Sequence, residues 1–371
     1  MVFCILLLFF HSTEAVCHDR GTGLSVTPDA LIYLNKADLS KGGYFGNYAI
    51  IVEKSTQQLI LFVYDGVWRE VDRFFCSTGK ISGDKLLSGD KKTPEGVYFF
   101  INKFRERHLS KRYGSLAFPV DYPNQLDRLE KKTGHSIWLH GTNKPLKDRD
   151  SNGCIVLANK DIKYLAEKIQ LYQTPIIITK CLTFVSTDQI IQKKNKLFGF
   201  LKHWNYVLGH AGLEKFKPLY EDNGLPGAAL WLTWFEQRRE LKPAELNMEL
   251  DIDISSIFYY QAVYRVILNQ KIRFSGSTTQ VGRLSLFLKE ENQKLTIIAE
   301  NFKPFSAGVL ISNDQPSLPA VWQKIINNLP QKFPMAGLIN QNKSSENRDC
   351  YHFPENEKIG KKVVSYNKIK F

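Results

Sequence analysis

The hydrophobic pattern in the first half of the chain consists of short β-rich runs separated by polar turns. Residues 48–63 hold two such runs around a polar turn, and residues 67–76 hold a third. Runs of this length that are rich in Val, Ile, Phe and Tyr predict β-strands. Further strands are expected at residues 97–101, 136–139 and 176–179. This half of the chain is therefore predicted to be mainly β.

One helix and one long loop interrupt these strands. The helix is predicted from apolar residues at the spacing i, i+3, i+4 and i+7, which is typical of an amphipathic helix. These residues are Ile162, Leu165, Ala166 and Ile169. Asn159 or Asp161 is expected to cap the first turn, and Pro175 follows the end of the helix. Residues 79–96 are rich in Gly, Lys and Asp, which predicts a long exposed loop.

The second half of the chain changes from helical periodicity to alternation. A long helix is predicted to start near Asp188, and a second, shorter helix follows it. Their apolar positions are Leu197, Leu201, Trp204 and Leu208 in the first helix and Leu230, Trp231, Trp234 and Phe235 in the second. Apolar and acidic residues then alternate over residues 248–254, which predicts a strand. Further strands are expected at residues 263–268, 284–288 and 295–299, with a turn at Glu291-Asn292. Helices followed by a curved antiparallel sheet predict an α+β domain.

Length and composition indicate two folded domains. The 371 residues are 43% apolar and 23% charged, which excludes a disordered or fibrous chain. Two domains of ~100–200 residues fit into this length. The predicted order is a signal peptide at 1–15, an N-terminal segment at 16–43, a mainly β domain at 44–180, a linker at 181–196, an α+β domain at 197–303 and a weakly ordered basic tail at 304–371.

The N-terminal residues favour export of the protein. Residues 2–10 are continuously apolar, but they fall far short of the ~20 residues that span a bilayer. Thr13 and Ala15 stand at positions −3 and −1 of a cleavage site of the secretory type. Lys and Arg are absent before the apolar run, which departs from the usual signal peptide, and a buried N-terminal strand is the alternative interpretation.

The net charge of +13 narrows the choice of partners. The basic residues are spread along the chain without a nucleic-acid-binding motif, so no nucleic-acid partner is expected. A basic surface would favour peripheral contact with an anionic wall polymer or a membrane, although solubility alone also explains it. Six cysteines without a C-x-x-C pair exclude a disulfide scaffold and a zinc ribbon. Whether Cys17, Cys76, Cys181 and Cys350 form disulfides is left open.

The segment 137–156 carries most of the candidate chemistry. A β run ends at His140-Gly141, and a polar loop leads to Ser151-Asn152-Gly153-Cys154. A histidine can take the proton of a cysteine thiol, and the ion pair so formed would lower the thiol pKa from ~8.5 to ~3.5–7.5. The alternative is a buried cysteine and a structural histidine in one sheet. A metal site built from His135 and Cys154 is disfavoured because no carboxylate accompanies them at ligand spacing.

These residues resemble the active-site signature of the L,D-transpeptidase catalytic domain of bacterial cell-wall enzymes. That signature is His-Gly, a loop, and then Ser/Thr-x-Gly-Cys. The resemblance extends over residues 44–180. Further matching motifs are Cys76-Ser77-Thr78-Gly79-Lys80, Gly83-Asp84-Lys85, Gly89-Asp90, Thr93-Pro94-Glu95-Gly96, Tyr122-Pro123-Asn124 and Trp138-Leu139-His140-Gly141-Thr142.

The resemblance implies a cysteine acyltransferase that needs no cofactor and no metal. Cys154 would be the nucleophile and His140 the general base and later the general acid. A backbone carbonyl of Gly141 or Ser151 would orient the imidazole, and the amides of Gly153 and Cys154 would stabilise the oxyanion. The candidate substrate-binding residues are Trp138, Thr142, Asn152 and Lys92, although a solvated loop charge also explains Lys92.

Two departures from the family pattern concern the acyl acceptor. Many family members have His at the position of Asn152 and Arg at that of Val156, and the loop between His140 and Cys154 is shorter here. These differences resemble the branch of cell-shape L,D-carboxypeptidases, and the second domain resembles the cone-shaped nuclear-transport-factor-two-like fold. A glycan or protein ligand would bind there, and Trp204, Trp231 and Trp234 would line its pocket or simply form core.

The resemblance therefore implies a peptidoglycan L,D-transpeptidase that acts on stem peptides in the periplasm of a Gram-negative bacterium. The first alternative is an L,D-carboxypeptidase that trims tetrapeptides to tripeptides. The second is a wall-binding protein without activity, which the presence of both His140 and Cys154 disfavours.

Overall fold

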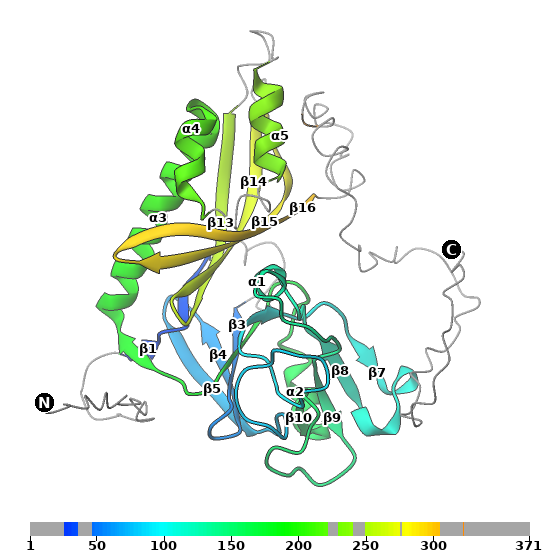
Figure 1. The fold of residues 1–371 in the computed structure, drawn as a ribbon. Coiled ribbons are helices and arrows are strands. Elements are labelled where there is room, and N and C mark those ends of the chain that lie inside the picture. The colour runs from blue at the N-terminus through cyan, green and yellow to red at the C-terminus, as the bar shows by residue number, and fades with distance from the viewer. Residues whose placement is uncertain are drawn as a thin grey trace, which may run out of the picture. The chain divides into compact units, whose positions relative to one another are not determined.

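The chain forms an α+β fold within residues 26–35, 47–221, 229–239, 249–274, 277–304 and 322, which a computed structural model describes (Figure 1). In this part of the chain the strands build two five-stranded sheets, one four-stranded sheet and one two-stranded sheet. No helix in the described ranges is long and apolar enough to span a membrane. The predicted signal peptide, much of the N-terminal segment and nearly all of the predicted tail lie outside the described residues.

The strands predicted within residues 48–63 and 67–76 belong to one five-stranded sheet. Its strands are β3 (Tyr48–Glu53), β4 (Gln58–Tyr64), β5 (Trp68–Phe75), β6 (Gly96–Phe99) and β11 (Pro175–Thr179). The order is β5-β4-β3-β11-β6, and β11 runs parallel to β3. Ile50 and Ile51 are both fully buried, in two different apolar clusters. Because successive side chains of a strand point to opposite faces, this sheet is covered on both sides.

A four-stranded sheet carries the His140 segment. Its strands are β7 (Phe104–Arg105), β8 (Leu116–Pro119), β9 (Trp138–Thr142) and β10 (Ile155–Ala158). β9 and β10 run parallel, and their register sets Val156 beside His140. Leu139 and Leu157 from this sheet share a buried cluster with Ile50 from the first sheet. The packing of the two sheets therefore holds β9 and β10 in place.

Short helices connect these strands. They are η3 (Glu106–His108), η4 (Lys111–Tyr113), α1 (Gln125–Leu129) and α2 (Asn159–Leu165). α2 is the helix predicted after Cys154, and its N-cap is Ala158, which makes no side-chain cap. The cap expected at Asn159 or Asp161 is wrong, because both residues lie inside the helix. The Asn159 carboxamide instead accepts a hydrogen bond from the Ser115 amide at 2.9 Å.

The second half of the chain begins with helices, in the predicted order. The elements are β12 (Phe184–Ser186), α3 (Thr187–His210), α4 (Leu213–Phe216), η5 (Lys217–Leu219) and α5 (Ala229–Arg238). Ser186 and Gln189 form a capping box that starts α3. Residues 181–196, which were expected to be a linker, are therefore in regular structure over most of their length. The polar composition of this segment predicts a linker, but many of its polar side chains lie on the exposed side of α3.

Four long antiparallel strands follow these helices. They are β13 (Glu249–Tyr260), β14 (Val263–Phe274), β15 (Ser277–Glu291) and β16 (Lys294–Pro304). The turn between β15 and β16 lies at the predicted place, and Asn292 and Gln293 have φ angles of 49° and 64° there. Two successive residues with positive φ are typical of a tight hairpin turn, which matches the right-handed twist of the strands.

The fifth strand of this sheet comes from the N-terminal segment, which the sequence did not predict. β2 (Leu31–Leu34) pairs with β13, and β1 (Val26–Pro28) pairs with β12. The side-chain amide of Asn35 also donates to Asp253 Oδ1 at 3.0 Å, across a sequence separation of 218. The sheet order is β16-β15-β14-β13-β2. We call β2 together with residues 184–304 the C-terminal module.

Tryptophan side chains form the core of the C-terminal module. Trp204 and Trp231 are fully buried with their rings 5.3 Å apart, and Trp234 is 2% exposed. Trp322 is also fully buried, and its ring stacks on Trp234 at 5.6 Å. It lies within the predicted weakly ordered tail, so at least this residue belongs to the core. The rest of that tail lies outside the described residues.

A separate apolar cluster joins the C-terminal module to the first half of the chain. Phe258 of β13 and Ile267 of β14 share this cluster with Ile51, Val97 and Phe99. The rings of Phe99 and Phe258 meet edge to face at 6.1 Å. Burial of apolar surface on both sides stabilises this arrangement.

Candidate active site

The parallel strands β9 and β10 position the two candidate catalytic residues, one in β9 and one directly before β10 (Figure 1). His140 lies in the middle of β9, and Cys154 is the residue immediately before β10. The register pairs Ile155 with Leu139, so that Cys154 enters its strand beside Trp138. The Cys154 thiol lies 3.6 Å from the Ser136 carbonyl oxygen, to which it donates.

The ring of His140 is held in one orientation by the backbone. Its Nδ1 lies 2.6 Å from the Gly141 carbonyl oxygen, so Nδ1 carries the proton and donates it there. The ring of Tyr113 meets the imidazole edge to face at 5.0 Å. This tautomer leaves Nε2 unprotonated, and Nε2 is therefore free to take a proton from a thiol.

Burial favours the neutral forms of both His140 and Cys154. Burial lowers the pKa of His140 to about 4, against a smaller opposing effect of its hydrogen bond to Gly141. Burial also raises the pKa of the Cys154 thiol to about 11, which the Trp138 backbone and Lys85 offset only in part. Both shifts oppose the ion pair expected from the sequence, since both groups are desolvated and the imidazole is hydrogen-bonded to a carbonyl rather than a carboxylate.

This neutral state predicts slow alkylation of Cys154. At pH 7 the reaction with iodoacetamide should be at least about tenfold slower than that of a free thiol, because the smaller thiolate fraction outweighs its greater nucleophilicity. The rate should rise by about tenfold per pH unit up to the thiol pKa of about 11. Mass spectrometry of the labelled protein, with Cys154→Ala subtracted for labelling at Cys76, measures this rate. A flat rate between pH 6 and 9 would instead indicate the ion pair.

Ser151 shapes the turn that leads into Cys154. Its hydroxyl donates to the Cys154 carbonyl oxygen at 2.6 Å and accepts from the Gly153 amide at 3.0 Å. Its own carbonyl accepts from the Lys80 amide at 2.9 Å. Of the two carbonyls predicted to orient His140, the geometry therefore uses that of Gly141 and not that of Ser151.

Gly153 is required by the backbone at this turn. Its φ is +129°, and a Cβ at this position would lie 2.8 Å from the Lys92 carbonyl oxygen. An L-residue cannot adopt this conformation without strain. The Gly153 amide already donates to Ser151, so the predicted pair of oxyanion donors is reduced to the Cys154 amide in this geometry.

The four predicted substrate-binding residues lie in different surroundings. Trp138 is half-buried between the rings of Phe104 and Tyr113, at 5.4 and 4.9 Å. Thr142 ends β9, and its hydroxyl accepts from the Lys144 amide at 3.0 Å. The remaining two residues flank Gly153: Asn152 is exposed, and Lys92 is half-buried with its carbonyl against Gly153.

The loop of residues 79–96 buries residues from two of the motifs that carry the family resemblance. It has no helix or strand before β6, as expected, but it is not uniformly solvated. Thr93 is fully buried, and its hydroxyl donates to the Gly153 carbonyl oxygen at 3.0 Å. Lys85 is 3% exposed and pairs with Asp90 at 2.7 Å. The family resemblance alone indicated both residues, Thr93 through the Thr-Pro-Glu-Gly motif and Lys85 through the Gly-Asp-Lys motif.

The described residues offer no cluster of three or more His, Cys, Asp or Glu side chains that could hold a metal. Cys76 and Cys154 are free thiols, whereas Cys181 is disulfide-bonded.

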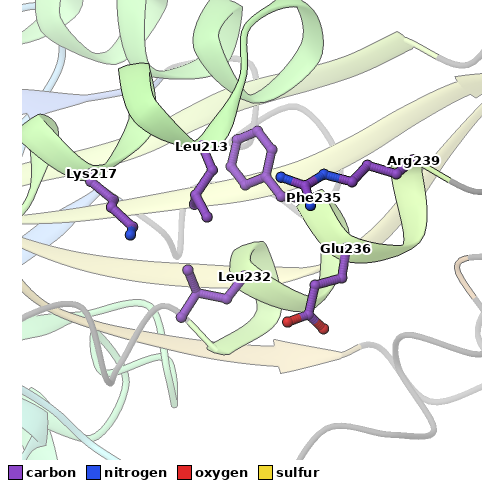
Figure 2. A pocket seen from close by; sticks show the side chains of 6 residues that line it. All are labelled: Leu213, Lys217, Leu232, Phe235, Glu236 and Arg239. Carbon is purple, nitrogen blue, oxygen red and sulfur yellow. The ribbon is translucent and has the colours of Figure 1, made fainter.

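A cavity of about 320 Å³ lies in the helical part of the C-terminal module (Figure 2). Its lining residues are Leu213, Lys217, Leu232, Phe235, Glu236 and Arg239. They come from α4, η5 and α5 and from the residue that follows α5. The cavity is therefore lined by apolar side chains together with charged groups of both signs. None of the candidate catalytic residues lines it.

Comparison with known proteins gives the family of the first domain. Residues 47–178 match the L,D-transpeptidase catalytic domain family, YkuD. Bd1075 of Bdellovibrio bacteriovorus is similar in structure, with a TM-score of 0.63 and 27% identity over 76% of this chain and 99% of that one. The helical cell shape determining protein Pgp2 of Campylobacter jejuni shares the fold, with a TM-score of 0.56 and 22% identity over 74% of this chain and 95% of that one. A search of curated protein sequences found no significant match. Residues 47–178 are therefore an L,D-transpeptidase (YkuD) catalytic domain, which accounts for the first half of the chain.

Proposed function

We propose that this protein is a peptidoglycan L,D-transpeptidase that acts through a Cys154 thioester. The observation that carries the proposal is that Cys154 immediately precedes β10, the parallel neighbour of the strand that holds His140, with the His140 tautomer set by the Gly141 carbonyl. A neutral imidazole beside a neutral thiol can accept the thiol proton when the nucleophile attacks. The match of residues 47–178 to a family of L,D-transpeptidases supports the substrate class, which is the stem peptide.

In the first step, the Cys154 sulfur attacks the carbonyl on the L-centre of diaminopimelate in a stem tetrapeptide. His140 Nε2 takes the thiol proton, and the Cys154 amide stabilises the oxyanion. The amide C–N bond then breaks, His140 returns the proton to the leaving amine, and D-alanine departs. A thioester between Cys154 and the shortened peptide remains.

In the second step, the acceptor decides the reaction. An amine of another stem peptide would give a 3→3 cross-link, and water would give a tripeptide. In both cases the acceptor loses a proton to His140, the bond between the acyl carbon and the Cys154 sulfur breaks, and His140 returns the proton to that sulfur.

L,D-carboxypeptidase activity is the second candidate. Two departures from the family pattern favour this activity. Asn152 is exposed in the turn before the nucleophile, and Val156 lies beside His140 in the sheet register. The structural similarity to a cell shape determining protein extends over 74% of this chain, which supports a role in cell shape. The predicted wall contact and the predicted ligand of the C-terminal module stay predictions.

The substrate lies outside the cytoplasmic membrane, so the proposal includes export to the periplasm of a Gram-negative bacterium. The disulfide at Cys181 supports an oxidising compartment.

The decisive experiment incubates the full-length protein with a disaccharide tetrapeptide and identifies the products by mass spectrometry. Cross-linked dimers with loss of D-alanine are expected for transpeptidation, and tripeptide monomers for carboxypeptidation. Cys154→Ala should give neither product. Unchanged substrate with the wild-type protein would contradict both activities and favour the wall-binding alternative.

A further inference from the structure

The C-terminal module reaches the catalytic domain through a hydrogen bond to a buried carboxylate. The hydroxyl of Tyr260, the last residue of β13, donates to Glu95 Oε2 at 2.6 Å. Glu95 is only 6% exposed and lies in the Thr-Pro-Glu-Gly segment of the catalytic domain. A buried carboxylate needs a partner for each oxygen, and Tyr260 supplies the partner for one of them.

The other oxygen of Glu95 pairs with Lys54. The Lys54 ammonium lies 2.9 Å from Glu95 Oε1, and it also donates to the carbonyl oxygens of Thr93 at 2.7 Å and Gly83 at 2.5 Å. An ammonium has three donors, and these contacts use all three. Lys54 is 2% exposed, so the position of its ammonium is fixed by these partners rather than by water.

Thr93 links Lys54 to the backbone next to Cys154. Its carbonyl is held by Lys54, and its hydroxyl accepts from the Gly79 amide at 2.8 Å and donates to the Gly153 carbonyl oxygen at 3.0 Å. That carbonyl belongs to the peptide bond between Gly153 and Cys154. The backbone position of Cys154 is therefore fixed by Thr93 from one side and by Ser151 from the other.

We propose that Tyr260 and Glu95 are positioning residues for Cys154, so that the C-terminal module holds the nucleophile in place through Glu95, Lys54, Thr93 and Gly153. This inference rests on the proposed function of Cys154. Every link in this path is a hydrogen bond of 3.0 Å or less between groups that are buried or half-buried. Loss of the Tyr260 hydroxyl leaves Glu95 Oε2 unpaired in a buried site, and Glu95 and Lys54 then rearrange toward new partners.

A second contact between the same parts of the chain does not lead to the nucleophile. Arg265 of β14 donates to the Val97 carbonyl at 2.6 Å and to Asp121 Oδ2 at 2.7 Å. Asp121 in turn accepts from the Phe99 amide. This contact joins the module to β6 and so supports the interface, whereas the Tyr260 contact reaches the loop that holds Gly153.

The test compares two tyrosine-to-phenylalanine variants of the full-length protein. Tyr264→Phe is the matched control, because its hydroxyl also donates to a carboxylate, Glu290 Oε2 at 2.9 Å, but within the C-terminal module. Tyr260→Phe is expected to lower kcat for D-alanine release by about tenfold with little change in KM, since a misplaced nucleophile slows chemistry more than binding. Tyr264→Phe should keep the wild-type kcat. Equal kcat values in the wild type and in Tyr260→Phe, or equal losses in both variants, would overturn the proposal.

A second measurement separates this inference from the proposed function. The pH profile of Cys154 alkylation by iodoacetamide needs no substrate, so it reports on the nucleophile even if the wild-type protein releases no D-alanine. Tyr260→Phe is expected to shift this profile and Tyr264→Phe to leave it in place. Glu95→Gln, which keeps the side-chain shape but removes the charge that pairs with Lys54, should shift it in the same way as Tyr260→Phe. Profiles that coincide with the wild type for both Tyr260→Phe and Glu95→Gln would reject the positioning role.

Discussion

Replacing His140 with glutamine is expected to lower kcat/KM for D-alanine release by about 10²–10⁴-fold, the usual contribution of a positioned general base. The thiol of Cys154 has a pKa of about 11, so very little thiolate exists at neutral pH without a base. His140 presents Nε2 for this purpose because its Nδ1–H is held on the Gly141 carbonyl. Glutamine can form a hydrogen bond there but cannot take up a proton. Timed mass spectrometry of the released D-alanine measures the loss.

His135→Gln is the matched control for His140→Gln. His135 lies five residues earlier, is exposed, and bonds through Nδ1 to Ser136 Oγ at 2.7 Å. It should keep kcat/KM within a factor of about three, the scatter expected of a surface change. The wild-type pH profile should also lose activity only below about pH 5, since the pKa of His140 is about 4. Retained activity in His140→Gln would assign the base to another group.

Replacing Lys54 with methionine is expected to reduce the free energy of unfolding by about 3–5 kcal/mol, the cost of breaking a buried ion pair from one side. Glu95 would stay buried with Tyr260 as its remaining side-chain partner. Two carbonyl oxygens, those of Thr93 and Gly83, would lose their donor as well. Denaturation in urea, followed by tryptophan fluorescence and circular dichroism, measures the change.

Lys80→Met is the comparison that isolates burial from charge. Lys80 pairs with Asp150 at 3.6 Å, and both side chains are about half exposed. An exposed pair of this kind contributes ~0–1 kcal/mol, so this variant should unfold close to the wild type. Equal destabilisation by Lys54→Met and Lys80→Met would contradict the structural role of the buried pair.

Local periodicity predicted most of the regular elements, because strand alternation and helical spacing are properties of neighbouring residues. The strands around residues 48–63, the turn at Glu291-Asn292 and the helix near Asp188 lie where the pattern put them. The caps at Asn159 and Asp161 failed, because the residue that begins a helix depends on contacts such as that of Asn159 with Ser115. Strand β2 was missed because its partner lies in the last third of the chain.

The sequence proposed the members of the candidate site, and these stay a prediction, but it did not indicate the electrostatics around them. The spacing of His140 and Cys154 and the family resemblance pointed to the pair, and in the fold Cys154 directly precedes β10, the strand next to that of His140. Their charge state depends on how deeply each group is desolvated, which a sequence does not encode locally. For the same reason Lys54 looked like an ordinary polar residue, although the fold buries it beside a carboxylate.

The pairing of β2 with β13 also has consequences for the order in which the chain folds. Asn35 and Asp253 are separated by 218 positions in the sequence, so at ~5–20 residues per second the ribosome completes this stretch roughly 10–40 s after β2 is made. Both sheets of the catalytic domain are contained in the intervening sequence and can form earlier. Until β13 is made, β2 lacks its partner strand, and an unpaired strand is prone to pairing with other chains. Closure of the sheet that contains β2 is therefore a late step with high contact order.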